Sequence, residues 1–183
     1  MVSRLLLQAL EQNSGIEARF AVLATVEHAT AFPRARTIVV REVLSQPLTL
    51  IFSTHATSQK VNQGPHGEIC WYFHRTREQF RISGSLVFFG EEPLPCTLRS
   101  TTPQPPGSYA CMREQMWQRL SADTRAQFVG EDELGCLHPP QSFVLGVLEA
   151  EAVDHLVLGK PNARTMFLRR EGNWDGGTVV ECT

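Results

Sequence analysis

Two segments of the chain combine basic side chains with spacings that suit an anion. Residues 34–41 read RARTIVVR, and alternation along a strand places Arg34 and Arg36 on the same face as Ile38 and Val40. A guanidinium on a face of buried aliphatic side chains needs an anionic partner, because burying it unpaired is costly. The pattern therefore indicates an anion site, an internal salt bridge or an exposed strand end.

The second segment, residues 53–60, reads STHATSQK and runs from an expected strand into the start of a helix. Hydroxyl groups, backbone N–H groups at a helix N-terminus and the Lys60 ammonium together could hold a phosphate. The segment lacks the glycines of a Walker loop, so Ser58 is equally explained as a helix cap.

A third segment places aromatic residues next to polar ones. Residues 71–73 (WYF) are expected in the core, and Gln79 follows at the start of another strand. A neutral amide both donates and accepts, so Gln79 is suited to the edge of an amide or imide. The sequence shows no Ser-His-Asp or Cys-His set, and none of its histidines stands in a ligand motif, so no metal site is expected.

The segments that must position these residues are mostly short and β-rich. Ser3 is expected to cap a helix that ends near residues 13–15. Apolar and β-branched runs then predict strands at 19–26, 34–43, 48–53, 68–74 and 78–89. Strands at such close intervals favour an antiparallel barrel or sandwich over alternating βαβ units.

A helical insert is expected at about residues 107–130, where Met112, Met116 and Leu120 share one face and Ser121 caps a second short helix. Proline-rich loops are expected before it at 91–96 and 101–107, and another loop after it at 130–142. Strands return at 142–149, 151–158, 165–170 and 178–181. Because strands flank the insert, residues 1–183 are interpreted as one domain.

Composition narrows the class of protein. The 183 residues carry 17 Lys and Arg against 19 Asp and Glu, and 42% are hydrophobic, which excludes a disordered chain. A pI near 6.3 gives no basic field for nucleic acid. The sequence lacks an apolar run long enough for a membrane span, and we expect no signal peptide. Five scattered cysteines favour reduced thiols in a cytoplasmic protein.

Taken in order, several pieces of the sequence resemble the pyridoxamine 5′-phosphate oxidase-like family of FMN-binding split barrels, and most closely its Alr4036-like branch. These pieces are LATV, PRARTIVVR, FST…SQKV, CWYF…REQFRISG, the helical RE-x-x-W-x-x-LS-x-x-x-R and the ending FLRREGNW. The resemblance spans nearly the whole chain. It implies a mainly β fold, a split β-barrel of antiparallel strands with a helical insert, and FMN as the cofactor.

The resemblance also assigns roles to individual positions. Arg36 and Lys60 would bind the FMN phosphate, and Gln79 would bond the pyrimidine edge of the flavin from the neighbouring subunit. A homodimer with flavin at the subunit interface is therefore implied. The positions assigned to cofactor binding are Arg36, Thr37, Ile38, Val39, Arg41, Ser53, Thr54, Ser58, Gln59, Lys60 and Gln79.

The chain departs from the oxidase pattern at several of its positions. Gln59 stands where the oxidase has an arginine, and Leu156 and Met166 replace a tryptophan and an arginine that close over the flavin. The substrate motif R-x-H falls on residues 162–164 (NAR). We therefore expect incomplete flavin occupancy and little pyridoxine 5′-phosphate oxidation.

For the substrate, the resemblance points to Tyr109 and Arg113, whose spacing matches the oxidase's phosphate clamp but suits helical packing equally well, and to Arg164. A cation such as Arg164 or Arg41 near the flavin would stabilise negative charge on the reduced ring. The implied function is FMN-dependent hydride transfer to or from a small molecule. The alternative is a split barrel that binds flavin or haem without catalysis.

Overall fold

The computed structural model describes residues 1–91, 106–129 and 137–181. Its helical elements are α1 (Val2–Gln12), η1 (Ile16–Arg19), η2 (Gln59–Asn62), α2 (Pro106–Arg119) and α3 (Ala122–Arg125). Its strands are β1 (Phe20–Val26), β2 (Pro33–Ser45), β3 (Leu48–His55), β4 (His66–Phe73), β5 (Glu78–Phe89), β6 (Phe143–Val157), β7 (Ala163–Arg170), β8 (Asn173–Trp174) and β9 (Thr178–Val180).

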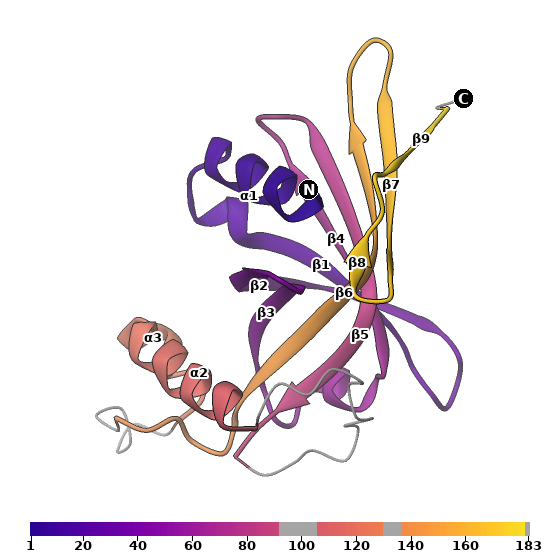
Figure 1. The fold of residues 1–183 in the computed structure, drawn as a ribbon. Helices are drawn as coiled ribbons and strands as arrows, with labels where there is room; N and C mark the ends of the chain where they lie inside the picture. The colour runs from indigo at the N-terminus through magenta and orange to yellow at the C-terminus, as the bar shows by residue number, and fades with distance from the viewer. Residues whose placement is uncertain (92–105, 130–136, 182–183) are drawn as a thin grey trace.

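Six strands form a closed antiparallel barrel. They neighbour one another in the order β3, β2, β1, β4, β5 and β6, and β6 then pairs with β3 to complete the circle. Figure 1 shows the strands wrapping around one interior, with β7, β8 and β9 standing beyond it. The expectation of a mainly β, antiparallel split barrel is confirmed.

The barrel splits along β6. The first half of β6 pairs with β3, whereas residues 152–157 pair with β7, and β5 runs along the opposite edge of both halves. A register shift in the β5–β6 ladder between Ser83 and Gly84 lies where β6 passes from one partner to the other. We expected separate strands at 142–149 and 151–158, but continuous pairing with β5 makes them one strand.

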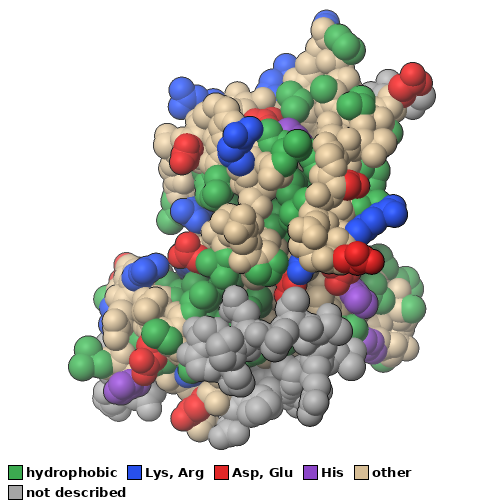
Figure 2. Space-filling view, in the orientation of Figure 1, with side chains coloured by type: hydrophobic (Ala, Val, Ile, Leu, Met, Phe, Trp, Pro, Cys, Tyr) green, Lys and Arg blue, Asp and Glu red, His purple; other side chains and the backbone are tan. Residues whose placement is uncertain are grey.

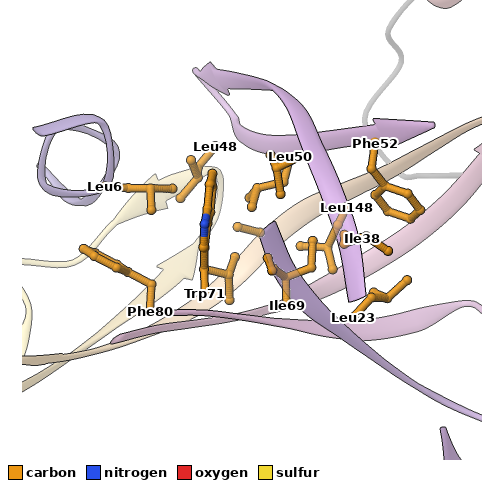
Figure 3. Packing of buried hydrophobic residues seen from close by; sticks show 14 of the residues in the cluster. Leu6, Leu23, Ile38, Leu48, Leu50, Phe52, Ile69, Trp71, Phe80 and Leu148 are labelled. Carbon is orange, nitrogen blue, oxygen red and sulfur yellow. The ribbon is translucent and has the colours of Figure 1, made fainter. Parts of the chain in front are cut away.

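The core fills the barrel and one of its openings. Alternate residues of the strands point inward, and α1 adds Val2, Leu6 and Ala9 to the same buried cluster. Figure 3 shows Leu6 directed toward Leu48 and Trp71. The Trp71 indole N–H donates to the Ala18 carbonyl at 2.8 Å, so its one polar atom is satisfied.

The helical insert packs on the outside of the barrel wall. Met116 of α2 and Leu120, directly after this helix, are buried with Ile51 of β3 and Phe143 of β6, and Met112 packs against the same cluster, so the expected shared face is confirmed. Ser121 caps α3 as expected, because its Oγ accepts from the Thr124 backbone N–H at 3.3 Å.

The cap expected at Ser3 is wrong. Met1 is the N-cap of α1, and Ser3 lies inside the helix, where its Oγ donates to the Ser45 carbonyl at 2.9 Å. Most of the loops expected at 91–96, 101–107 and 130–142 lies outside the described residues, as do Cys96, Cys136 and Cys182. No helix in the described ranges is long and apolar enough to cross a membrane.

Gly84 is required by the β6 crossover. A Cβ atom at this position would overlap the Glu149 carbonyl oxygen, which belongs to backbone and cannot swing away. We expect Gly84→Ala to lower the free energy of unfolding by about 2–3 kcal/mol in urea titrations. Gly176→Ala is the matched control, since nothing lies within 4 Å of its Cβ position, and should change stability by less than about 0.5 kcal/mol. Equal effects of the two changes would contradict this account.

Candidate functional site

Lys60 is the centre of a cluster of polar side chains at the end of β3, called the pocket of Lys60 and Arg36 below for the anion that it could hold. It lies on η2, directly after the strand, and its Nζ donates to the Thr54 hydroxyl at 2.8 Å and to the Ser58 hydroxyl at 2.6 Å. Thr54 is on the face of β3 that also carries the core residue Phe52. The ammonium is therefore held by neutral hydroxyl groups.

Arg36 lies on the inner face of β2, in the row that continues with Ile38 and Val40. Its guanidinium donates to the Thr25 hydroxyl at 2.5 Å and to the Gln63 side-chain oxygen at 2.6 Å. It also bonds the carbonyls of Leu23 and Arg34. From the sequence we expect this arginine to need an anion. Its hydrogen-bond partners among the described residues are all neutral.

The sequence left an anion site, a salt bridge or an exposed strand end open for residues 34–41, and the structure shows a salt bridge at Arg34. The Arg34 side chain is exposed, and its Nη2 forms an ion pair with Glu27 at 2.7 Å. The salt-bridge interpretation of residues 34–41 thus applies to Arg34 alone.

The Lys60 and Arg36 charges are close and uncompensated. Burial lowers the pKa of the Lys60 ammonium below its usual range, and the Arg36 charge lowers it further. Burial likewise lowers the pKa of Arg36, with a smaller effect from Arg34. None of the salt bridges among the described residues involves Lys60 or Arg36. Two cations and two hydroxyls without a carboxylate make a site for a doubly charged anion such as phosphate.

A third cation, Arg41, lies further along the same strand, where the β2–β3 register shifts between Val40 and Glu42. Its Nε is buried and has no hydrogen-bond partner among the described residues. Burial lowers the pKa of Arg41, and the neighbouring Arg19, which donates to the Arg41 carbonyl, lowers it further. This orphaned donor is a second place where an anionic or acceptor group would be stabilised.

The other residues expected around a flavin are divided between the two faces of the sheet. Ile38 is buried in the core, whereas Thr37 and Val39 point outward, opposite Val22 and Phe20 of β1. Because the Ile38 side chain points into the core, Ile38 could contact a ligand on the outer face only through its backbone. On β3, Ser53 and Thr54 alternate, so the Ser53 side chain points away from Lys60. Gln59 is exposed at the start of η2.

Gln79 is not brought to Lys60 within one chain. It lies on the outer face of β5, three strands from β2, beside the core residue Phe80. Its row continues through Leu156 of β6 to Arg164 of β7. Arg164 is held by two hydrogen bonds to Asp154, at 2.9 and 2.7 Å. One chain thus carries the phosphate-type pocket on the inner face and the Gln79 row on the outer face.

Tyr109 and Arg113 have structural roles in this chain. The Arg113 guanidinium donates to the carbonyls of Phe143, Pro139 and Pro140, at 2.8, 3.3 and 2.6 Å. The Tyr109 ring stacks on Phe89, with 4.3 Å between ring centroids, and burial raises its pKa. These contacts agree with the packing interpretation that the sequence left open for the pair.

Sequence reasoning missed Thr25 and Gln63. Both are buried, and Thr25 donates to the Gln63 side-chain oxygen at 2.8 Å while both contact Arg36. Thr25 carries a weak signal, because it continues the inward row of Leu23 on β1. Gln63 carries none, because its position depends on how the chain after η2 folds back. No group of His, Cys, Asp and Glu spaced for a metal occurs in the described part of the chain.

Comparisons with known proteins agree on one family. The model described as pyridoxamine 5′-phosphate oxidase, FMN-binding domain, matches residues 2–90. A solved structure from Nostoc punctiforme, a pyridoxamine 5′-phosphate oxidase-related, FMN binding protein, is 30% identical, with a TM-score of 0.81 over 98% of this chain and 96% of that one. The pyridoxine/pyridoxamine 5′-phosphate oxidase 2 of Arabidopsis thaliana is 29% identical over 90% of this chain and 86% of that protein.

A more distant structure shares the fold only. PhzG from Burkholderia lata, solved in complex with tetrahydrophenazine-1-carboxylic acid, has a TM-score of 0.70 at 18% identity, over 99% of this chain and 90% of that one.

The uncompensated charges predict phosphate binding that depends on pH. Inorganic phosphate should raise the Tm at neutral pH, because it pairs with charged Lys60. Because burial and the Arg36 charge lower the Lys60 pKa, the affinity for phosphate should begin to fall at a pH below the usual lysine pKa of about 10.4. Thermal shift measured with phosphate at about pH 8 and about pH 10 tests this.

Lys60→Gln is the control for that measurement. It should weaken phosphate binding by about 10-fold or more and remove most of the pH dependence. A wild-type protein whose phosphate-induced shift is the same at both pH values would contradict the assignment of Lys60.

Proposed function

This chain belongs to the pyridoxamine 5′-phosphate oxidase-like family of FMN-binding split barrels, and on that basis we propose that it binds FMN and catalyses oxidoreduction of a small molecule. The observation that carries the proposal is the pocket of Lys60 and Arg36, where both cations bond hydroxyl groups and neither forms a salt bridge with a carboxylate of the described residues. A phosphate monoester fits this donor set in charge and in number of acceptors.

The pocket favours FMN over larger flavins. Its two basic side chains, Lys60 and Arg36, suit one phosphate group, and the sequence has no glycine-rich dinucleotide motif for an adenylate half. FMN, when bound, supplies hydride transfer at its ring. The chain's own residues bind and orient it: Lys60, Arg36, Thr54 and Ser58 hold the phosphate end.

The outer face of the barrel suits the ring. Thr37 and Val39 lie there beside Phe20 and Val22 of β1. Further along the same strand, the buried Nε of Arg41 has no hydrogen-bond partner among the described residues and offers a donor to a polar edge of the ring or of a substrate.

We propose a twofold homodimer that completes each site. Phe20, Val22 and Tyr72 lie on one outer sheet face and are 40–47% exposed. Figure 2 shows that hydrophobic side chains also reach the surface between charged ones. A second copy on this face would cover the apolar residues and bring its own Gln79 row to the ring, which a single chain keeps apart from its phosphate pocket.

Pyridoxine 5′-phosphate is not assigned as the substrate. In the oxidase pattern the pair at Tyr109 and Arg113 would clamp a substrate phosphate, but here Arg113 is engaged by three carbonyls. A phosphate that must displace those bonds gains little. Anaerobic reduction of bound flavin by NAD(P)H, compared with pyridoxamine phosphate, distinguishes the reaction classes.

We predict that flavin released from the purified protein is FMN and that Lys60→Ala and Arg36→Ala each raise its Kd by about 10- to 150-fold. Each change removes a charge-assisted hydrogen bond, worth about 1.5–3 kcal/mol. Fluorescence titration of the apoprotein measures the Kd. Arg75→Ala, on an exposed turn, is the control and should leave it unchanged.

Two results would overturn the FMN assignment. One is unchanged affinity in both pocket variants. The other is a purified protein that carries haem, recognised by its Soret band, and does not bind FMN.

Light scattering at micromolar concentration should give about twice the 20.5 kDa mass of one chain. Val22→Arg places a charge in the centre of the apolar outer face and should yield monomers with weakened FMN binding. Ile16→Arg, an exposed position on η1, should stay dimeric. A wild-type monomer that binds FMN with full affinity would refute the shared site.

A further inference from the structure

Gln63 holds Arg36 without neutralising it. The Gln63 side chain is 4% exposed, and its oxygen accepts from Arg36 Nη2 at 2.6 Å and from the Thr25 hydroxyl at 2.8 Å. Thr25, 3% exposed, accepts in turn from Arg36 Nη1. The three side chains form a closed network in which the only formal charge is that of the guanidinium.

Other arginines on the strands of this chain have different partners. Four of them have a carboxylate within 2.9 Å of the guanidinium: Arg34 with Glu27, Arg81 with Glu68, Arg164 with Asp154 and Arg169 with Glu149. Arg41 of β2 forms no salt bridge among the described residues, but no amide holds it as Gln63 holds Arg36. Only at Arg36, among these described strand arginines, does a buried amide stand where those four have an acid. An amide offers the same acceptor oxygen with no charge.

The absence of charge matters because Lys60 is close. Burial and the Arg36 charge both lower the pKa of Lys60, as expected for neighbouring cations with no counter-ion. A carboxylate at position 63 would pair with Arg36 and cancel half of the positive charge that faces an incoming anion.

We propose that Gln63 is the residue that determines specificity for the phosphate of the cofactor: as a buried neutral acceptor, it orients Arg36 while leaving the Arg36–Lys60 pair doubly positive. This inference rests on the proposed function for the identity of the ligand. The site then selects a dianionic phosphate monoester over a ligand that lacks the phosphate, and Thr25 supports it as a positioning residue.

Two substitutions at position 63 separate charge from shape. Gln63→Glu keeps the acceptor oxygen and the size but adds a charge, whereas Gln63→Met keeps the size and removes the acceptor. If Gln63 acts through its neutrality, Gln63→Glu impairs phosphate recognition more than Gln63→Met does. If Gln63 only supports the fold through its hydrogen bonds, Gln63→Met is the more damaging change.

The readout is the ratio of the riboflavin Kd to the FMN Kd, measured by fluorescence titration of the apoprotein, with circular dichroism as a check on folding. Gln63→Glu is expected to lower this ratio by about 10- to 100-fold, with the riboflavin Kd unchanged. Thr25→Val should lower it by about 2- to 10-fold. Thr49→Val is the matched control, since Thr49 is equally buried but bonds only a local carbonyl, and should leave the ratio unchanged.

Inorganic phosphate is the second probe and separates this inference from the proposed function. If the wild type binds FMN more tightly than riboflavin but Gln63→Glu leaves the ratio unchanged, the inference is wrong and FMN binding stands. If the wild type binds no flavin, yet phosphate raises its Tm and Gln63→Glu removes that shift, the role of Gln63 stands and the FMN proposal fails. If the wild type binds neither flavin nor phosphate, both are overturned.

Discussion

The hydrogen bonds between β3 and β6 close the sheet into a barrel, and closure decides which side of every strand meets the core. On β3 it turns Phe52 and Thr54 inward and leaves Ile51 for the helices outside. Lys60 follows directly on η2 and bonds Thr54, so the position of its ammonium depends on this pairing.

Closure also explains how the molecule distributes its charges. Along the outer sheet, acids and bases alternate from Glu68 to Arg81 and from Asp154 to Arg164, in pairs that neutralise one another near water. Arg36, on the inner face of β2, instead has only neutral hydrogen-bond partners among the described residues. The difference lies in the partners and not in the arginines: carboxylates are present on the outer face and amide or hydroxyl groups in the pocket.

The two halves of the chain differ in how their arginines are engaged. The part that matches the family model, residues 2–90, contains the whole pocket of Lys60 and Arg36. Arg113 and Arg164 lie beyond it, and both are engaged within the chain, by carbonyls and by Asp154 respectively. The first half therefore carries Lys60 and Arg36 without a carboxylate partner among the described residues, whereas the second half uses Arg113 to fix α2 against the loop before β6.

The residues by themselves predicted most of the strands, their antiparallel arrangement in a barrel or sandwich, and the shared face of Met116 and Leu120, because alternation and helical periodicity are local properties. The resemblance to the family added the split barrel, which the structure confirms, and the phosphate site at Arg36 and Lys60, which stays a prediction. The sequence could not determine that β6 is one strand, since the β5 ladder that joins its halves is a long-range pairing. Nor could it assign Gln63 to Arg36, or Arg113 to three carbonyls: both contacts join residues more than 20 positions apart. Which side chains share one pocket was decided only when tertiary pairing fixed the register, because a shift of one residue turns every side chain to the other face.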